Sequence, residues 1–388
     1  MRRIANTPRP NWQASLRQYP YGAEALPAAA SWDESVRYEF SADEIDAIEA
    51  VADEVHGMVR EAVRQVVETR THGLLGIKPE AARMIDASWK AYWNGGQPDA
   101  RQGGLYGRLD FAHDGRDGLK LVGCNYDSPV GLFEAAVVQW NWLEAAFSGA
   151  DQFNGLHEAL ADRWREMVVG LRGRDTVHLT CATPDPRREG ELAYLAATAE
   201  EAEVSTRILP IQDIGWDGSH FVDMDEEAIS WLLKLYPWEA LLEDQFGQNL
   251  KSASMSVLDP AWRIPASNHG LLAVLWELYP EHPNLCPASF READLGDAGM
   301  VIQRSLLGLD RAAERITEGG ETVAETEPSA NPGGYVYIAR PAWWRGAEVR
   351  TVLQTWVVGD KCLGMTVREG SDEIFSPEDA AVVPHLFR

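Results

Sequence analysis

The spacing of apolar residues predicts a long amphipathic helix in the first part of the chain. After Ser41, apolar side chains recur three and four residues apart, at Ile45, Ile48, Ala52, Val55, Val59, Ala62 and Val66. This spacing is typical of one face of an α-helix. Ser41 followed by Glu44 forms a capping box, which marks the helix start. Residues 1–40 are rich in Pro, Trp and Tyr, and we expect an irregular lead-in there.

The segments 105–114 and 119–124 are predicted to be the two strands of a hairpin. The turn between them contains Gly115 and Gly118, at both of which we expect a positive φ. A polar turn over 125–129 follows, and a helix is predicted from Leu132 to Phe147.

Strands and a helix alternate in the middle of the chain, which indicates an α/β layer. Strand-like runs cover 177–181, 206–209 and 231–235, and the segment 192–202 is helical in character. A further helix is predicted over 271–278, with Ser267 and Asn268 as its cap.

The C-terminal part is predicted to hold an antiparallel sheet preceded by a mobile loop. The strand-like runs are 335–339, 349–358 and 363–368, with turns between them. Residues 310–332 are charged and rich in Glu and Thr, and they contain Gly319 and Gly320. We therefore expect a mobile loop or a partly disordered lid over 310–332.

The acidic composition narrows the classes of partner. The chain of 388 residues has 35 basic and 60 acidic side chains, a formal net charge of −25. Nucleic acid is not expected as a partner, because a phosphate backbone demands clustered Lys and Arg. An anionic membrane surface is disfavoured as well, and no apolar stretch approaches the ~18 residues of a membrane span. A neutral, cationic or amine-bearing partner fits this charge better, and the partner expected for the whole chain is a small molecule or a short peptide.

Cysteine usage and the first residues indicate a cytoplasmic protein. Cys124, Cys181, Cys286 and Cys362 form no C-x-x-C pair, so neither a zinc ribbon nor a redox dithiol is predicted. The start lacks the apolar run of a secretory signal, and reduced thiols are therefore expected. Neither the P-loop pattern nor the G-x-S-x-G motif of serine hydrolases occurs.

The densest polar group lies on the predicted hairpin and the turn after it. Residues i and i+2 of a strand point to one face, so Arg108 and Asp110 should project together, with Asn125 and Asp127 delivered near by. Two carboxylates, an amide and a guanidinium can hold a divalent cation with its anionic ligand. The alternative is an Arg–Asp pair that pins the hairpin.

Long motifs in the same region carry a family resemblance. The run YGRLDFAHDGRDGLKLVGCNYDSPVGLFEAAVVQWNWLE, which starts at Tyr106, resembles the signature region of the glutathionylspermidine synthase family, in its short single-activity branch. KLYPWE at 234–239, TWVVGDKCLGMTVRE at 355–369 and VPHLF at 383–387 agree in order. The resemblance implies an α/β (α+β) protein with an ATP-grasp-like fold and a preceding α/β (pre-ATP-grasp) domain. It also implies ATP- and magnesium-dependent C–N ligation through an acyl phosphate.

The resemblance divides the chain into four expected parts. Residues 1–104 would form the N-terminal helical and irregular part of the ATP-grasp core, and 105–150 the hairpin and helix of the site. Residues 151–260 would form an inserted pre-ATP-grasp-like α/β domain, and 261–388 the C-terminal ATP-grasp-like lobes.

The resemblance also implies roles for single residues. Arg108, Asp110 and Glu239 are the catalytic candidates: Asp110 or Glu239 could act as general base, and Arg108 could hold a carboxylate or oxyanion. Asp110 and Asn125 match magnesium ligands. The positions expected to bind substrate are Asn125, Asp127, Ser128, Glu134, Trp238 and Arg368. Lys234 and Trp356 match as well, and packing explains them equally.

Departures from the family pattern fall on the nucleotide side. Gly123 stands where the family has a magnesium-binding glutamate, and His269 and Gln303 stand at lysine positions that contact ATP. Asp310 and Arg311 replace glycines of the phosphate loop, and Ile338 replaces the adenine-side glutamine. Arg304 and Arg311 could substitute for the lost lysines.

These departures lead to the hypothesis of a divergent member with an eroded ATP and magnesium site. It would act on or bind a small amine- or carboxylate-bearing molecule or a short peptide. One alternative is an active ATP- and Mg²⁺-dependent amide-bond ligase, and another is a non-catalytic partner subunit. No cofactor is expected under the main hypothesis; ATP and Mg²⁺ are expected under the first alternative.

Overall fold

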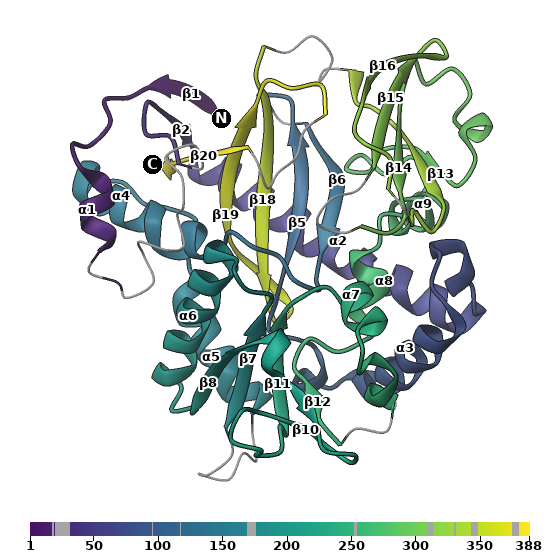
Figure 1. Cartoon of the computed structure of the whole chain (residues 1–388). Helices are drawn as coiled ribbons and strands as arrows, with labels where there is room; N and C mark the ends of the chain where they lie inside the picture. The colour runs from purple at the N-terminus through teal and green to yellow at the C-terminus, as the bar shows by residue number, and fades with distance from the viewer. Residues whose placement is uncertain are drawn as a thin grey trace.

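The computed structural model describes residues 1–388 except 18, 20–31, 95, 117, 169–175, 252–253, 309–312, 330, 343–347 and 375–379. Within this part the chain is a mixed α/β protein with several sheets, arranged as Figure 1 shows. A central sheet lies between a second antiparallel sheet, a parallel sheet and a small sheet that holds both chain ends.

The central sheet contains the predicted hairpin in its five-stranded order β20-β19-β18-β5-β6. The strands are β5 (Tyr106–His113), β6 (Leu119–Asn125), β18 (Arg350–Val358), β19 (Lys361–Gly370) and β20 (Ala381–Val383). All neighbours run antiparallel. The C-terminal strand β18 thus pairs along the whole of β5, although the two are far apart in sequence.

The hairpin turn differs from the prediction at one glycine. Gly115 has φ 81°, as expected, whereas Gly118 lies outside the positive-φ region. A Cβ at Gly118 would approach Asp114 Oδ2 to 2.5 Å. Asp114 Oδ1 accepts the backbone N–H of Gly118 at 2.9 Å, so the Asp114 side chain lies close to Gly118 and would have to shift for a larger residue.

The predicted long helix is α2 (Ala42–Thr69), and the structure confirms its capping box. The apolar face named from the sequence is buried, and it packs with α8 (Arg263–Ser267), α9 (Leu271–Leu278) and β19. Helix α9 has the predicted bounds, but the predicted cap is wrong: Gly270 is the N-cap residue and no side chain caps the helix. Asn268 Oδ1 instead accepts the Gly270 N–H at 2.9 Å in the turn before α9.

The second five-stranded sheet has the order β13-β17-β14-β15-β16. Its strands are β13 (Ala288–Ser289), β14 (Met300–Ser305), β15 (Glu314–Glu318), β16 (Glu321–Glu325) and β17 (Tyr335–Ala339). The prediction of a mobile loop over 310–332 is wrong for β15 and β16, which form a hairpin through Gly319 and Gly320. The prediction of one C-terminal sheet is also wrong, because β17 pairs with β14 and not with β18.

The parallel sheet has the order β12-β11-β7-β8 and confirms the predicted α/β layer. Its strands are β7 (Val177–Cys181), β8 (Thr206–Pro210), β11 (Trp231–Leu235) and β12 (Ser256–Val257). Helix α6 (Pro186–Glu201) contacts β7 and β8 and also packs on α5 (Leu156–Met167). It begins earlier than predicted because Asp185 caps it and Pro186 is tolerated in a first turn.

The lead-in is more regular than predicted. Strands β1 (Arg2–Ala5) and β2 (Val36–Phe40) pair with each other, and β2 pairs in parallel with β21 (His385–Phe387). Long-range pairing with the C-terminus therefore orders these residues. The helix predicted over 132–147 contains a π-helix, η4 (Glu134–Val138), followed by α4 (Gln139–Ala146).

The remaining elements are short or peripheral: α1 (Trp12–Leu16), η2 (His72–Leu75), α3 (Pro79–Tyr92), β3 (Trp93–Asn94), β4 (Gln97–Pro98), η3 (Ala100–Gln102), η5 (Ile211–Asp213), β9 (Gly215–Trp216), β10 (Phe221–Val222), α7 (Trp238–Glu243), η6 (Gly247–Lys251) and η7 (Glu292–Leu295). Among the described helices, none combines the length and the apolar character that a membrane crossing requires.

Candidate functional site

The central sheet places the predicted site residues opposite one another on three strands. Arg108 on β5 faces Asn125 on β6 and Trp356 on β18. Asp110, two residues along β5, faces Gly123 on β6 and lies opposite Gln354 on β18. The expectation that Arg108 and Asp110 project together is therefore met by the strand periodicity.

A chain of hydrogen bonds joins these side chains in the protein interior. Arg108 Nε donates to Asp110 Oδ1 at 2.8 Å and its Nη2 to Oδ2 at 3.1 Å, while Nη1 donates to the Val130 carbonyl at 2.9 Å. Gln354 Nε2 donates to Asp110 Oδ1 at 3.2 Å, and its Oε1 accepts from Arg368 Nε at 2.6 Å. Arg368 is fully buried, and Arg108 and Asp110 are nearly so. The structure thus shows the Arg–Asp pair that was one of the two interpretations of this sequence.

Gln354 is a member of this network that the sequence analysis missed. It is fully buried and bridges Asp110 to Arg368. The available signal was a glutamine within the run VLQTWVV of β18, whose other residues are apolar except Thr355. A buried amide in such a run needs hydrogen-bond partners, so it points to a polar network.

The side chains of the turn after β6 have partners in different parts of the structure. Asn125 Oδ1 accepts the N–H groups of Asp127 and Ser128, both at 3.1 Å. The Asp127 carboxylate forms an ion pair with Lys234 and accepts the Trp238 N–H at 2.7 Å. The expectation that Asp127 joins Arg108 and Asp110 on one face is therefore wrong, because β11 and the start of α7 supply its partners.

Trp238 and Glu239 lie at the start of α7. Trp238 is buried, its Nε1 donates to the Asp259 carbonyl at 2.9 Å, and Lys234 Nζ lies 4.7 Å from its ring centroid. Glu239 Oε2 accepts the N–H of Gly308 at 2.9 Å, which links α7 to the segment after β14. These contacts tie the parallel sheet to the two antiparallel sheets near the site.

Gly131, in the segment before η4, packs closely against the central sheet, and the charged pair Glu134 of η4 and Arg187 of α6 lies near it. A Cβ at Gly131 would lie 2.8 Å from Arg368 Nη2 and 3.6 Å from the Trp356 ring, and Gly131 has φ 106°. Arg187 Nη2 donates to Glu134 Oε1 at 3.3 Å. Glycine is therefore required at 131 for both close packing and backbone conformation.

Glu191 on α6 is a second residue that the sequence analysis missed. Its Oε1 accepts the Leu132 N–H at 2.8 Å and its Oε2 accepts the Phe133 N–H at 3.3 Å, so it caps the helix that carries Glu134. Burial raises the pKa of Glu191 to about 8, and the nearby Glu134 charge adds to the increase. Nothing in the local pattern of α6 marks this carboxyl, because its partners lie on a distant segment.

Ser128 Oγ and Glu134 Oε2 are buried polar atoms of this region that have no hydrogen-bond partner within the described part of the chain. Both side chains are 1% exposed. Buried polar groups are normally hydrogen-bonded, and exceptions are candidates for contacts with a ligand. We call Arg108, Asp110, Ser128, Glu134, Gln354 and Arg368 the polar cluster.

The predicted nucleotide positions lie on and beside the second sheet. His269 Nδ1 is 2.9 Å from the Ser305 carbonyl, and burial, with the Arg304 charge, lowers its pKa to about 3. Gln303 on β14 lies between Tyr337 and Arg315 of the neighbouring strands.

Three further nucleotide-side positions either make contacts within the protein or lie outside the described residues. Arg304 pairs with Glu314 at 2.9 Å and donates to the Val122 carbonyl at 2.8 Å, so it is engaged within the protein. Asp310 and Arg311 lie outside the described residues.

The donor set at Asp110 and Asn125 does not fit a magnesium ion. Mg²⁺ demands near-octahedral oxygen coordination. Asp110 is held by Arg108 and Gln354, and the Asn125 oxygen accepts two backbone N–H groups. A Cβ at Gly123 would lie 3.7 Å from Asp110 Oδ2, so a carboxylate there would complete the site, but glycine supplies none. No group of three or more His, Cys, Asp or Glu suited to a metal occurs among the described residues.

Comparisons with known proteins agree with this architecture. The sequence matches the glutathionylspermidine synthase preATP-grasp family over residues 3–388. A putative acid–amine ligase of Haemophilus influenzae is 33% identical over 404 residues, covering 100% of both chains. The bifunctional glutathionylspermidine synthetase/amidase of Escherichia coli is 27% identical over 218 residues, covering 49% of this chain and 34% of its own.

One solved structure extends the comparison to three dimensions. A glutathione synthetase-like effector from Globodera pallida aligns over 98% of both chains, with a TM-score of 0.52 and 9% sequence identity. At this identity the likeness concerns the fold alone. Together these matches confirm the predicted α/β fold class and the resemblance found in the sequence.

Proposed function

Because this chain belongs to the glutathionylspermidine synthase preATP-grasp family, we propose that its polar cluster binds a small carboxylate- or amine-bearing molecule or a short peptide. We further propose that the chain binds ATP and Mg²⁺ much more weakly than an ordinary ligase of this family. The observation that carries the first proposal is that Ser128 Oγ and Glu134 Oε2 are buried without a hydrogen-bond partner among the described residues, while Arg187 holds the other oxygen of Glu134.

The chemistry of the cluster suits a ligand that bears both kinds of charge. Guanidinium groups recognise carboxylates through paired N–H donors, and Arg108 and Arg368 are buried on one sheet face. Asp110, Gln354 and the Val130 and Ala380 carbonyls accept from them in this structure, so a ligand carboxylate would have to replace some of these acceptors. The Glu134 carboxylate would accept from an amine, and the Ser128 hydroxyl could donate to a carbonyl or accept from an N–H. A short peptide or an amino acid derivative carries all of these groups.

Weak nucleotide binding follows from the side chains at the positions that the family uses for phosphate and metal. Gln303 carries no charge, and His269 is neutral at pH 7 because its pKa is about 3. A hydrogen bond to a charged group contributes about 1.5–3 kcal/mol. Two lysine contacts and one metal carboxylate would therefore amount to roughly 5–9 kcal/mol if additive. Micromolar affinity corresponds to about 8 kcal/mol in total, so the expected loss is most of the affinity.

Calorimetry on the full chain tests the nucleotide part. We expect no Mg–ATP binding tighter than millimolar for the native sequence. The triple variant Gly123→Glu, His269→Lys, Gln303→Lys should recover measurable affinity if these positions face the nucleotide. Low-micromolar binding of Mg–ATP by the native chain would overturn the proposal.

Ligand-observed NMR with glycylglycine, which has one amine and one carboxylate, tests the substrate part. Ser128→Ala and Glu134→Gln should each weaken binding about two- to tenfold, the range for one hydrogen bond. Glu144→Gln is the matched control, because Glu144 is an exposed glutamate on the adjoining helix α4. Equal binding by all four proteins would contradict the assignment of the cluster as the binding site.

An active acid–amine ligase is the second candidate, favoured by the full-length match to a putative enzyme of that class. In that case ADP and phosphate would form only when an acid and an amine are both supplied with Mg–ATP. A coupled assay for ADP with a panel of dipeptides and polyamines distinguishes the two candidates. ADP release that depends on both substrates supports the ligase and removes the proposal of an eroded nucleotide site.

A further inference from the structure

The parallel sheet carries a pocket of its own, with a volume of about 280 Å³. Ala182, Ile211 and Tyr236 line it, and they directly follow the carboxyl ends of β7, β8 and β11. Ligands of open α/β sheets bind at this edge, outside the carboxyl ends of the strands. The volume lies just under the usual range of small-molecule sites, roughly 300–1,000 Å³, so it suits a small ligand.

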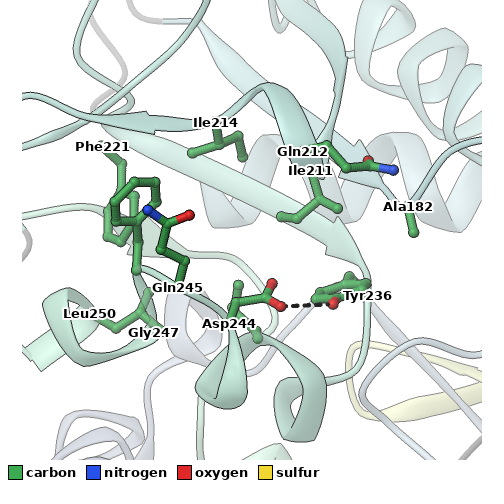
Figure 2. A pocket seen from close by; sticks show the side chains of 12 residues that line it. Ala182, Ile211, Gln212, Ile214, Phe221, Tyr236, Asp244, Gln245, Gly247 and Leu250 are labelled. Carbon is green, nitrogen blue, oxygen red and sulfur yellow. Dashed lines mark hydrogen bonds between the residues drawn. The ribbon is translucent and has the colours of Figure 1, made fainter.

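The wall of the pocket is mainly apolar. Aliphatic and aromatic side chains come from the segment after β8, from β10, from α7 and from the residues around η6: Ile211, Ile214, Phe221, Leu241, Phe246 and Leu250. Figure 2 shows Ile211 and Ile214 above Asp244 and Tyr236, with Phe221 and Gln245 towards the left of the view. A predominantly apolar wall with a few polar groups is the usual composition of a small-molecule site.

The polar groups of the pocket fix the charge that a ligand should carry. Tyr236 Oη donates to Asp244 Oδ1 at 3.2 Å, as Figure 2 shows, and this bond orients the carboxylate. Gln212 is engaged by Thr183, since its Nε2 donates to the Thr183 carbonyl at 2.6 Å and its Oε1 accepts the Thr183 N–H at 3.3 Å. Asp244 is the charged residue among those that line the pocket, and a carboxylate accepts several hydrogen bonds.

We propose that this pocket binds a small organic cation, an amine with an apolar body, as a ligand separate from that of the polar cluster. The apolar wall would enclose the hydrocarbon part, and Asp244 would take the ammonium group. The formal charge of −25 on the chain favours the approach of cations and disfavours anionic ligands of the same shape. The residues that line the pocket are not members of the polar cluster. The two proposals can therefore be tested separately, and either can fail without affecting the other.

Three probes of similar shape test the charge preference: 2-phenylethylamine, 2-phenylethanol and phenylacetate, measured by ligand-observed NMR and calorimetry on the full chain. The amine should bind about two- to fivefold more tightly than the alcohol, the range for an ion pair at an exposed carboxylate. Phenylacetate should bind more weakly than both. Equal affinity for the amine and the alcohol, or tighter binding of phenylacetate, would overturn the proposal.

Variants place the binding in this pocket. Asp244→Asn should abolish the advantage of the amine over the alcohol, whereas Asp213→Asn, the same change at an exposed neighbour outside the lining, should leave it unchanged. Ala182→Phe replaces a small lining residue with a large one that fills the pocket, and it should remove binding of the amine and of the alcohol. Asp244→Asn is a mild exposed change that keeps the test informative if Ala182→Phe disturbs folding. Unaltered binding in both variants contradicts the assignment.

Discussion

The two five-stranded sheets of this protein differ in the side chains that they carry at the candidate site positions. In the central sheet, Arg108, Asp110, Gln354 and Arg368 are buried and joined in one chain of hydrogen bonds. In the second sheet and the turn before α9, the positions at which the family resemblance predicts nucleotide contacts hold Gln303, Ile338 and His269. In the central sheet the buried charges satisfy one another, and under the proposed function the second sheet has lost charges that a triphosphate would have balanced.

The largest expected effect on stability is that of breaking the ion pair between Lys234 on β11 and Asp127 in the turn after β6. Lys234→Met leaves the buried Asp127 carboxylate without its cation, and the expected loss in free energy of unfolding is about 3–5 kcal/mol. Urea denaturation measures this loss. The double variant Lys234→Met, Asp127→Asn should recover part of it, because asparagine still accepts the Trp238 N–H. A loss below about 1 kcal/mol in the single variant would show that the pair is not effectively buried.

A matched pair of glutamine substitutions compares the sheets directly. Gln354→Leu removes the bridge between Asp110 and Arg368 and should cost about 1–3 kcal/mol, the penalty for buried groups left unsatisfied. Gln303→Leu, the same change on the half-buried β14 position, should stay within about 0.5 kcal/mol. Thermal and urea unfolding report both, and similar losses at the two positions would remove the contrast drawn between the sheets.

The pH dependence of stability should identify Glu191. Its pKa is about 8 in the folded protein, above the ordinary value of 4.5, so the folded state binds more protons between these pH values. Stability from this group is therefore present below about pH 4.5 and is lost as pH rises towards 8. The slope is at most about 1.4 kcal/mol per pH unit.

Glu191→Gln should remove that decrease, and urea unfolding at several pH values between 5 and 8 measures it. Glu200→Gln, an exposed position on the same helix α6, is the control and should keep the native slope. An unchanged slope in Glu191→Gln would mean that this carboxyl titrates normally in the folded protein.

The smallest expected effect on stability is that of adding a carboxylate at position 123, where the family has a magnesium-binding glutamate. Gly123→Glu places a carboxyl beside Asp110, since a Cβ there lies 3.7 Å from Asp110 Oδ2. Mg²⁺ should then stabilise the variant by on the order of 1 kcal/mol at about a tenfold excess over its Kd, while the native chain gains nothing. Differential scanning fluorimetry with and without MgCl₂ measures the difference. Gly123→Gln, which adds similar bulk without charge, should respond much less.

Local patterns predicted much of the secondary structure and part of the site. The α2 capping box, the β5–β6 hairpin and the strands of the parallel sheet follow from short-range spacing, and all are present. The Arg108–Asp110 pair follows from strand periodicity alone. The Glu- and Thr-rich composition led to the wrong prediction of a loop at β15 and β16, because pairing with β14 in a sheet outweighed the local polarity.

The sequence by itself determined the family, the mixed α/β architecture and the strand that carries Arg108 and Asp110. Only the tertiary structure decided that Gln354 joins them, that Asp127 turns to Lys234, and that Glu191 caps the segment before Glu134. Each of these contacts spans more than 50 residues along the chain. A buried polar group takes whichever partner the packing brings within hydrogen-bond distance, and local spacing carries no information about that partner.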